Sequence, residues 1–85
     1  PGNPSYLDTY GWILYQQGKF TDARGYIEKA LAASGENGTL LEHLGDIWFR
    51  LGDEVKAREF WQRAKAAGVE SEFIDRKLAD GKLYE

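Results

Sequence analysis

The sequence predicts an all-α fold, a right-handed array of five antiparallel helices in which two helix–turn–helix units are followed by a fifth helix. Three observations indicate this fold. The chain resembles itself at a shift of 34 residues, its apolar residues recur at helical spacing, and glycines separate the apolar stretches. At that shift ten positions of the first unit carry the same residues as the second unit with no insertion, among them Gly11 with Gly45 and Ala30 with Ala64.

Length and composition limit the functions that the chain is expected to have. Its 85 residues, 42% apolar and 29% charged, are typical of one small globular domain. No apolar stretch reaches about 18 residues, so we expect no membrane span and a soluble protein of the cytoplasm or periplasm. A net charge of −3 without a basic stripe argues against a nucleic acid partner. The absence of cysteine excludes disulfides, and a single histidine, His43, argues against a metal site.

The first unit is predicted to contain two helices. Asn3 is expected to cap the first helix, and Pro4 suits its first turn. Gly18 is expected to end this helix, because glycine tolerates a positive φ angle. A second helix is predicted over residues 20–33, followed by a turn at residues 34–36. The residues expected to face the core are Leu7, Tyr10, Ile13, Leu14, Ala23, Tyr26, Ile27, Ala30 and Leu31.

The second unit repeats this pattern. Its first helix is expected to be capped by Asn37 or by Thr39, which forms a capping-box pattern with Glu42. Gly52 is expected to end that helix, and Asp53 to cap the next, which runs to about residue 67. The residues expected to face the core are Leu41, Leu44, Ile47, Trp48, Leu51, Val55, Ala57, Phe60, Trp61 and Ala64.

The fifth helix is predicted to cover the end of the array. Gly68 separates it from the fourth helix, Ser71 is its expected cap, and Gly81 ends it. An open end of a helical array exposes apolar surface and needs a helix with a polar outer side. The residues expected on that polar side are Asp75, Arg76, Lys77 and Asp80.

Two glycines in helix interiors indicate close contact between helices. Gly11 and Gly45 occupy the same register of the two units, where glycine costs about 1 kcal/mol relative to alanine. Because the cost recurs at one register, we expect a neighbouring helix to approach closely at both positions.

This pattern resembles the tetratricopeptide repeat family over residues 4 to about 69. The first repeat matches the family pattern at Leu7, Tyr10, Gly11, Leu14, Gly18, Phe20, Ala23, Ile27 and Ala30. The second matches at Leu41, Leu44, Gly45, Trp48, Gly52, Ala57, Trp61 and Ala64. The proline that usually links repeats is absent. The resemblance implies an α-solenoid, and the ending is similar to the C-terminal part of longer bacterial repeat proteins.

The resemblance divides the chain into segments. Residues 1–3 are expected to be a linker or a cloning remnant, residues 4–37 the first repeat and residues 38–70 the second. Residues 71–80 form the expected capping helix and residues 81–85 a tail.

The resemblance also implies a function, which is to bind another protein or peptide in a concave groove lined by the first helix of each repeat. In this sequence the groove positions hold Ser5, Asp8, Trp12, Tyr15, Gln16, Thr39, Glu42, Asp46, Phe49 and Arg50. Trp12 is the strongest candidate, because tryptophan is enriched at binding hot spots. An alternative for Tyr15 and Phe49 is that they support neighbouring helices, and an alternative for the acids is that they are merely solvated.

Three carboxylates and three aromatic residues favour a ligand that is basic and apolar. The lysine and asparagine residues with which some family members hold a chaperone's C-terminal carboxylate are absent, since those positions carry Asp8, Trp12, Thr39 and His43. No catalytic activity and no cofactor are implied. Two further expectations remain open. The chain is either a binding module or only the structural end cap of a longer array, and an apolar N-terminal end around Tyr6 and Tyr10 favours weak self-association.

Overall fold

A computed structural model describes residues 4–84 and the side chains of residues 6–84. It contains five helices, α1 (Pro4–Gln16), α2 (Phe20–Ser34), α3 (Gly38–Arg50), α4 (Glu54–Ala66) and α5 (Ile74–Asp80). No strand occurs within this part of the chain. The all-α fold and the five helices expected from the sequence are therefore confirmed, whereas the expected cap at Asn3 lies outside the described residues.

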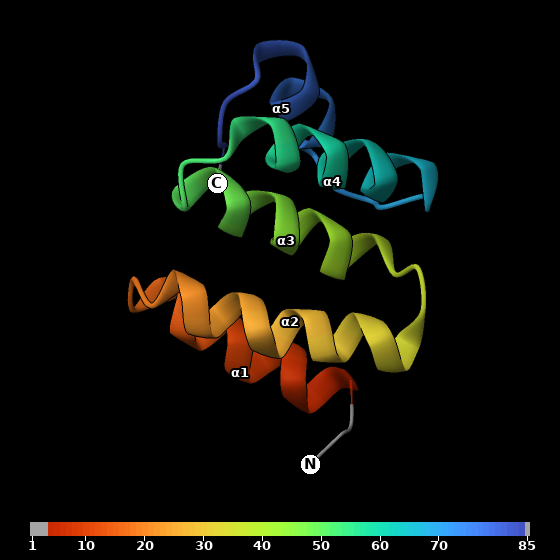
Figure 1. Ribbon diagram of the computed structural model, residues 1–85. Coiled ribbons are helices and arrows are strands. Elements are labelled where there is room, and N and C mark those ends of the chain that lie inside the picture. Colours follow the sequence, from red (N-terminus) through yellow and green to blue (C-terminus); the bar gives the residue numbers. More distant parts are fainter. Residues whose placement is uncertain (1–3, 85) are drawn as a thin grey trace.

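The helices follow one another through the molecule in chain order (Figure 1). α1 packs against α2, α3 packs against α4, and the two pairs meet where α2 contacts α3. α5 lies beyond α4 at the end opposite α1 and α2. α1 and α3 also touch each other directly, so the first helices of the two units share one side of the molecule.

The core consists of two apolar clusters that meet at α3. One joins α1, α2 and one side of α3, where Leu44 and Ile47 are fully buried. The other joins the opposite side of α3 with α4 and α5, around Leu41 and Trp61. α3 is covered on both sides because it lies between the two clusters.

Local signals fix the starts and ends of the helices. The Asn37 side chain accepts a hydrogen bond from the Leu40 amide at 3.1 Å, so Asn37 is the cap of α3 and Thr39 lies inside the helix. Asp53 caps α4 as expected, by accepting from the Lys56 amide at 2.9 Å. Gly52 has a φ of 93°, which confirms the need for glycine at this turn.

Some residues expected in the core are exposed. Val55 is 80% exposed, because the buried stripe of α4 consists of Ala57, Trp61 and Ala64 and Val55 falls outside it. Leu51, at the C-terminal cap of α3, is also exposed. Tyr10 and Ile13 lie on the outer side of α1 and are largely exposed, although the Tyr10 ring also contacts Tyr26 of α2.

The close helix contacts expected at two glycines are confirmed. A Cβ atom on Gly11 would lie 2.7 Å from Ile27 Cδ1 of α2. A Cβ atom on Gly45 would overlap the indole ring of Trp61 and lie 3.0 Å from the Ala57 carbonyl oxygen of α4. Glycine at these two positions therefore permits the close packing of each helix pair.

Candidate functional site

All ten candidate groove residues lie on α1 or α3. The side chain of Ser5 lies outside the described residues. The exposed side chains are Gln16, Thr39 and Arg50, those of Asp8, Trp12 and Phe49 are half-buried, and those of Tyr15, Glu42 and Asp46 are buried. The ten residues therefore do not form one uniformly open surface. Seven of them fall into three groups according to their neighbours, whereas Phe49 packs against the cluster around Trp61, with ring centroids 6.0 Å apart.

The first group is a stack of rings around Trp12. The ring of Trp12 lies parallel to that of Tyr15, with centroids 4.4 Å apart, and to that of His43, with centroids 4.0 Å apart. Nδ1 of His43 lies 2.9 Å from a carboxylate oxygen of Asp8. Because the imidazole is held both by the carboxylate and by the indole, α1 and α3 fix Trp12 in one position, and part of its π surface is covered.

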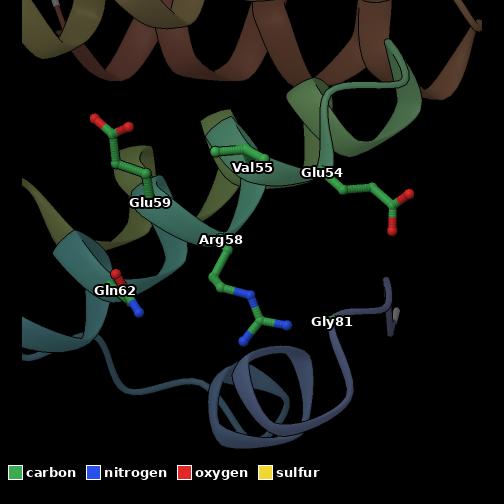
Figure 2. A pocket seen from close by; sticks show the side chains of 6 residues that line it. All are labelled: Glu54, Val55, Arg58, Glu59, Gln62 and Gly81. Carbon is green, nitrogen blue, oxygen red and sulfur yellow. The ribbon is translucent and has the colours of Figure 1, made fainter.

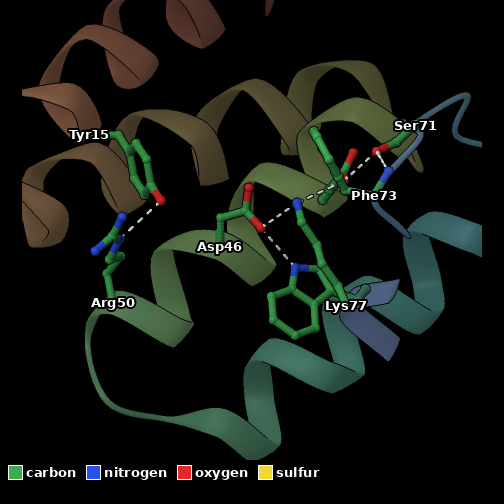
Figure 3. Close-up of polar contacts among 8 residues, drawn as sticks. Tyr15, Asp46, Arg50, Ser71, Phe73 and Lys77 are labelled. Carbon is green, nitrogen blue, oxygen red and sulfur yellow. Dashed lines mark hydrogen bonds and ion pairs between the residues drawn. The ribbon is translucent and has the colours of Figure 1, made fainter. Parts of the chain in front are cut away.

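The second group lies around Tyr15, which is only 4% exposed. Its hydroxyl accepts a hydrogen bond from Nε of Arg50 at 3.3 Å (Figure 3). The Arg50 guanidinium also lies 6.0 Å from the ring centre of Phe20. Tyr15 therefore supports the junction of α1, α2 and α3, as the alternative interpretation proposed. An open pocket of about 370 Å³ is lined here by Tyr15, Gln16, Gly18, Phe20 and Arg50.

The third group corrects the expectation for the acidic residues and for the capping helix. Lys77 of α5, expected on the polar outer side, is only 3% exposed. Its ammonium donates to Glu42 and to Asp46, each at 2.8 Å, so these two carboxylates are not solvated groove residues. Figure 3 shows the Lys77 side chain directed from α5 toward Asp46 on α3.

Further donors complete this network. Nε1 of Trp61 donates to the same Asp46 oxygen at 3.0 Å, and the Ser71 hydroxyl donates to Glu42 at 2.7 Å. Ser71 also accepts from the Phe73 amide at 3.2 Å, but α5 begins at Ile74 with Phe73 at its cap position, so Ser71 is not the cap that the sequence predicted. Buried charges are stable only when they are paired and hydrogen-bonded, and here α5 supplies the cation that the two carboxylates of α3 require.

The spacing of the sequence indicates that Lys77 pairs with an acidic residue, which the helical pattern alone does not reveal. Asp8 and His43 are 35 residues apart, and so are Glu42 and Lys77. In both pairs an acid contacts a basic residue one repeat and one position later, so the 34-residue shift relates one pair to the other. Lys77 therefore marks α5 as the counterpart of α3.

Burial raises the pKa of Asp46 from 3.8 to about 6, against the opposing effects of the Lys77 ammonium and of the hydrogen bonds from Lys77 and Trp61. Burial destabilises the charged carboxylate by more than Lys77 and Trp61 stabilise it. Its raised pKa is therefore a property of the junction between α3 and α5.

The contribution of Asp46 to stability is expected to fall as the pH rises from about 4 to about 6. The folded state keeps the proton on Asp46 to a higher pH than the unfolded chain, so deprotonation favours unfolding in this interval. Urea unfolding of the wild type and of Asp46→Asn measures this effect at about pH 4.5 and about pH 7. We expect the wild type to be more stable relative to the variant at the lower pH. A difference between the two proteins that does not change with pH would contradict the assignment.

An open pocket of about 450 Å³ lies away from the candidate groove, between α4 and the residue that ends α5. It is lined by Glu54, Val55, Arg58, Glu59, Gln62 and Gly81 (Figure 2). Arg58 extends from α4 toward Gly81, and its guanidinium donates to the Leu78 carbonyl oxygen at 2.6 Å. This hydrogen bond holds the end of α5 on α4, which accounts for Arg58 structurally.

The part of the chain that the structure describes contains no group of three or more acidic, histidine or cysteine side chains placed to hold a metal ion. Within the same residues, none of the helices has the length and apolar character that crossing a membrane requires.

Comparison with known proteins agrees with the repeat pattern. A family model described as the tetratricopeptide repeat matches residues 11–70. A TPR repeat-containing protein of Pseudomonas aeruginosa is 41% identical to the chain over 46 residues. The matched part is 54% of this chain and only 8% of that relative, so the chain spans a small fraction of the relative's length.

Proposed function

Because the chain belongs to the tetratricopeptide repeat family, we propose that it binds a peptide or a partner helix on the inner face that α1 and α3 form. Repeats of this family generally mediate protein–protein interaction and are typically not enzymes. The proposal therefore contains no catalytic step and requires no cofactor. It names the surface and the residues that would hold the partner.

The observation that carries the proposal is the fixed position of Trp12. Its indole is held by Tyr15 and His43 and is only partly buried. A large aromatic side chain that is already ordered loses little conformational entropy when a partner covers it. Trp12 is therefore suited to be the anchor of an interface, with Gln16 and Arg50 as exposed polar neighbours.

The internal ion pairs refine the expected ligand. Glu42 and Asp46 already neutralise Lys77, and part of the Trp12 ring surface already contacts other rings. Asp8, 28% exposed in its side chain, is the carboxylate that remains accessible beside Trp12. The proposed ligand is therefore a mainly apolar segment with one lysine or arginine placed near Asp8.

Replacing Trp12 with alanine is expected to weaken binding of such a segment at least about tenfold, because the anchor is lost. The probe is a peptide selected against the wild-type protein from a library of random peptides, and titration calorimetry measures its dissociation constant. Asp8→Asn should have a smaller effect that diminishes as salt is added, since an exposed charge contributes little to affinity.

The control is Val55→Ala, which changes an exposed apolar residue on α4, outside the proposed site. It should leave the dissociation constant unchanged. Equal affinity of the peptide for the wild type and for Trp12→Ala would contradict binding on the inner face.

A second candidate role is that of a structural end cap for a longer array. It is favoured by α5, whose Lys77 is buried between two carboxylates of α3. In this role the binding residues would lie in other repeats. A library from which no peptide binds the inner face would favour this role over the first.

A further inference from the structure

The outer side of α1 is apolar and exposed, in contrast to the same register of α3. Tyr10 is 40% exposed and Ile13 is 44% exposed. Their counterparts 34 residues later, Leu44 and Ile47, are fully buried. This side of α1 is therefore exposed to solvent, whereas the equivalent side of α3 is completely buried.

The exposed apolar side continues onto α2. Tyr26 meets Tyr10 edge to face, with ring centroids 4.7 Å apart. On α2, Gly25 and Tyr26 each lie three or four residues from both Asp22 and Lys29, which places the four residues on one stripe of the helix. Asp22 and Lys29 are exposed, and neither forms an ion pair within the described part of the chain.

Gly25 is the feature of this stripe that packing within one chain does not explain. Gly11 and Gly45, also in helix interiors, are each required by a neighbouring helix. At Gly25 a Cβ atom would meet no other atom within 4 Å. Glycine weakens a helix interior, and no contact within the described residues accounts for this cost at Gly25.

We propose that two copies of this chain associate through α2, with the two helices antiparallel about a two-fold axis between residues 25 and 26. In this arrangement Asp22 of each copy lies opposite Lys29 of the other. Tyr26 of each copy lies opposite Gly25 of the other, where the missing side chain leaves room for the ring. Tyr10 and Ile13 flank the contact and lose exposed apolar surface.

A second copy of the chain fits this stripe because the stripe is self-complementary. A two-fold interface brings the same surface of both partners together, so it requires each charge to face its opposite when the stripe is reversed. Asp22 and Lys29 meet this requirement, and so do Tyr26 and Gly25. The contact leaves Trp12 uninvolved, so a dimer would carry two inner faces and bind a bivalent partner more tightly.

Analytical ultracentrifugation of the full chain from micromolar to millimolar concentration tests the association. The wild type should dimerise reversibly. Lys29→Asp and Asp22→Lys should each raise the dimer dissociation constant at least about tenfold, because like charges then face each other twice. An equimolar mixture of the two variants should dimerise again, because each charge then faces its opposite.

Cross-linking gives an independent measurement, because the chain has no cysteine of its own. Mixing Asp22→Cys and Lys29→Cys chains places two thiols opposite each other and leaves Gly25 open for the Tyr26 ring. Mixing Lys56→Cys and Arg63→Cys chains places thiols at the equivalent positions of α4. Under mild oxidation, the first mixture should form a covalent dimer much faster than the second. A wild type that stays monomeric at millimolar concentration, or charge variants that do not restore each other, would overturn the proposal. Equal cross-linking rates for the two mixtures would overturn it as well.

Discussion

Replacing Lys77 with methionine is expected to lower the free energy of unfolding by about 3 to 5 kcal/mol, because it leaves two buried carboxylates without their cation. Glu42 is 8% exposed and Asp46 is 3% exposed, so water does not replace the lost ammonium at either position. Methionine retains most of the aliphatic length of lysine, so the loss reports the charge and its hydrogen bonds. Urea unfolding at about pH 7, above the pKa of Asp46 in the wild type, measures it.

The matched control is Lys65→Met, which removes the lysine of an exposed ion pair with Asp75. Both side chains of that pair are more than half exposed, so its removal should cost at most about 1 kcal/mol. Adding Glu42→Gln and Asp46→Asn to Lys77→Met should recover much of the loss, because no unpaired charge then remains. A Lys77→Met variant that unfolds with the same loss as Lys65→Met would contradict the described network.

Replacing Gly45 with leucine is expected to destabilise the protein by about 3 kcal/mol, through overpacking. A side chain at this position meets the indole ring of Trp61 and the Ala57 carbonyl oxygen. Trp61 is 1% exposed and its Nε1 is hydrogen-bonded to Asp46, so the ring has little freedom to move. Thermal or urea unfolding of the purified variant measures the loss.

Gly25→Ala is the control for this substitution, because it also adds a side chain to a glycine inside a helix. No atom lies within 4 Å of the added Cβ, so the gain in helix propensity should stabilise the monomer by about 1 kcal/mol. The measurement belongs at micromolar concentration, where self-association does not contribute. Equal effects of the two substitutions would mean that Gly45 does not lie at a close contact.

The sequence predicted where the candidate site lies but not the contacts within it. The repeat register placed the ten candidate residues on α1 and α3, and it singled out Trp12. It did not show that Tyr15 is buried beneath Arg50, or that His43 stacks on Trp12 and contacts Asp8. These contacts join residues of two different repeats, and such pairings depend on how the repeats are rotated against each other.

The sequence by itself determined the helices and their order. Apolar spacing, glycines with positive φ, and caps such as Asp53 act within a few residues, so they are readable without tertiary structure. The repeated Gly11 and Gly45 also predicted close helix contacts, because a recurring cost at one register needs a recurring reason.

Only the tertiary structure decided which polar residues are buried. Lysine is usually a surface residue. The long aliphatic stem of Lys77 nevertheless passes through the interface between α3 and α5, and its ammonium reaches Glu42 and Asp46. Valine is usually a core residue, yet Val55 is exposed because no described helix covers its side of α4. Helical periodicity specifies which residues share a side of a helix, but the neighbour that covers that side is set by contacts between residues far apart in sequence.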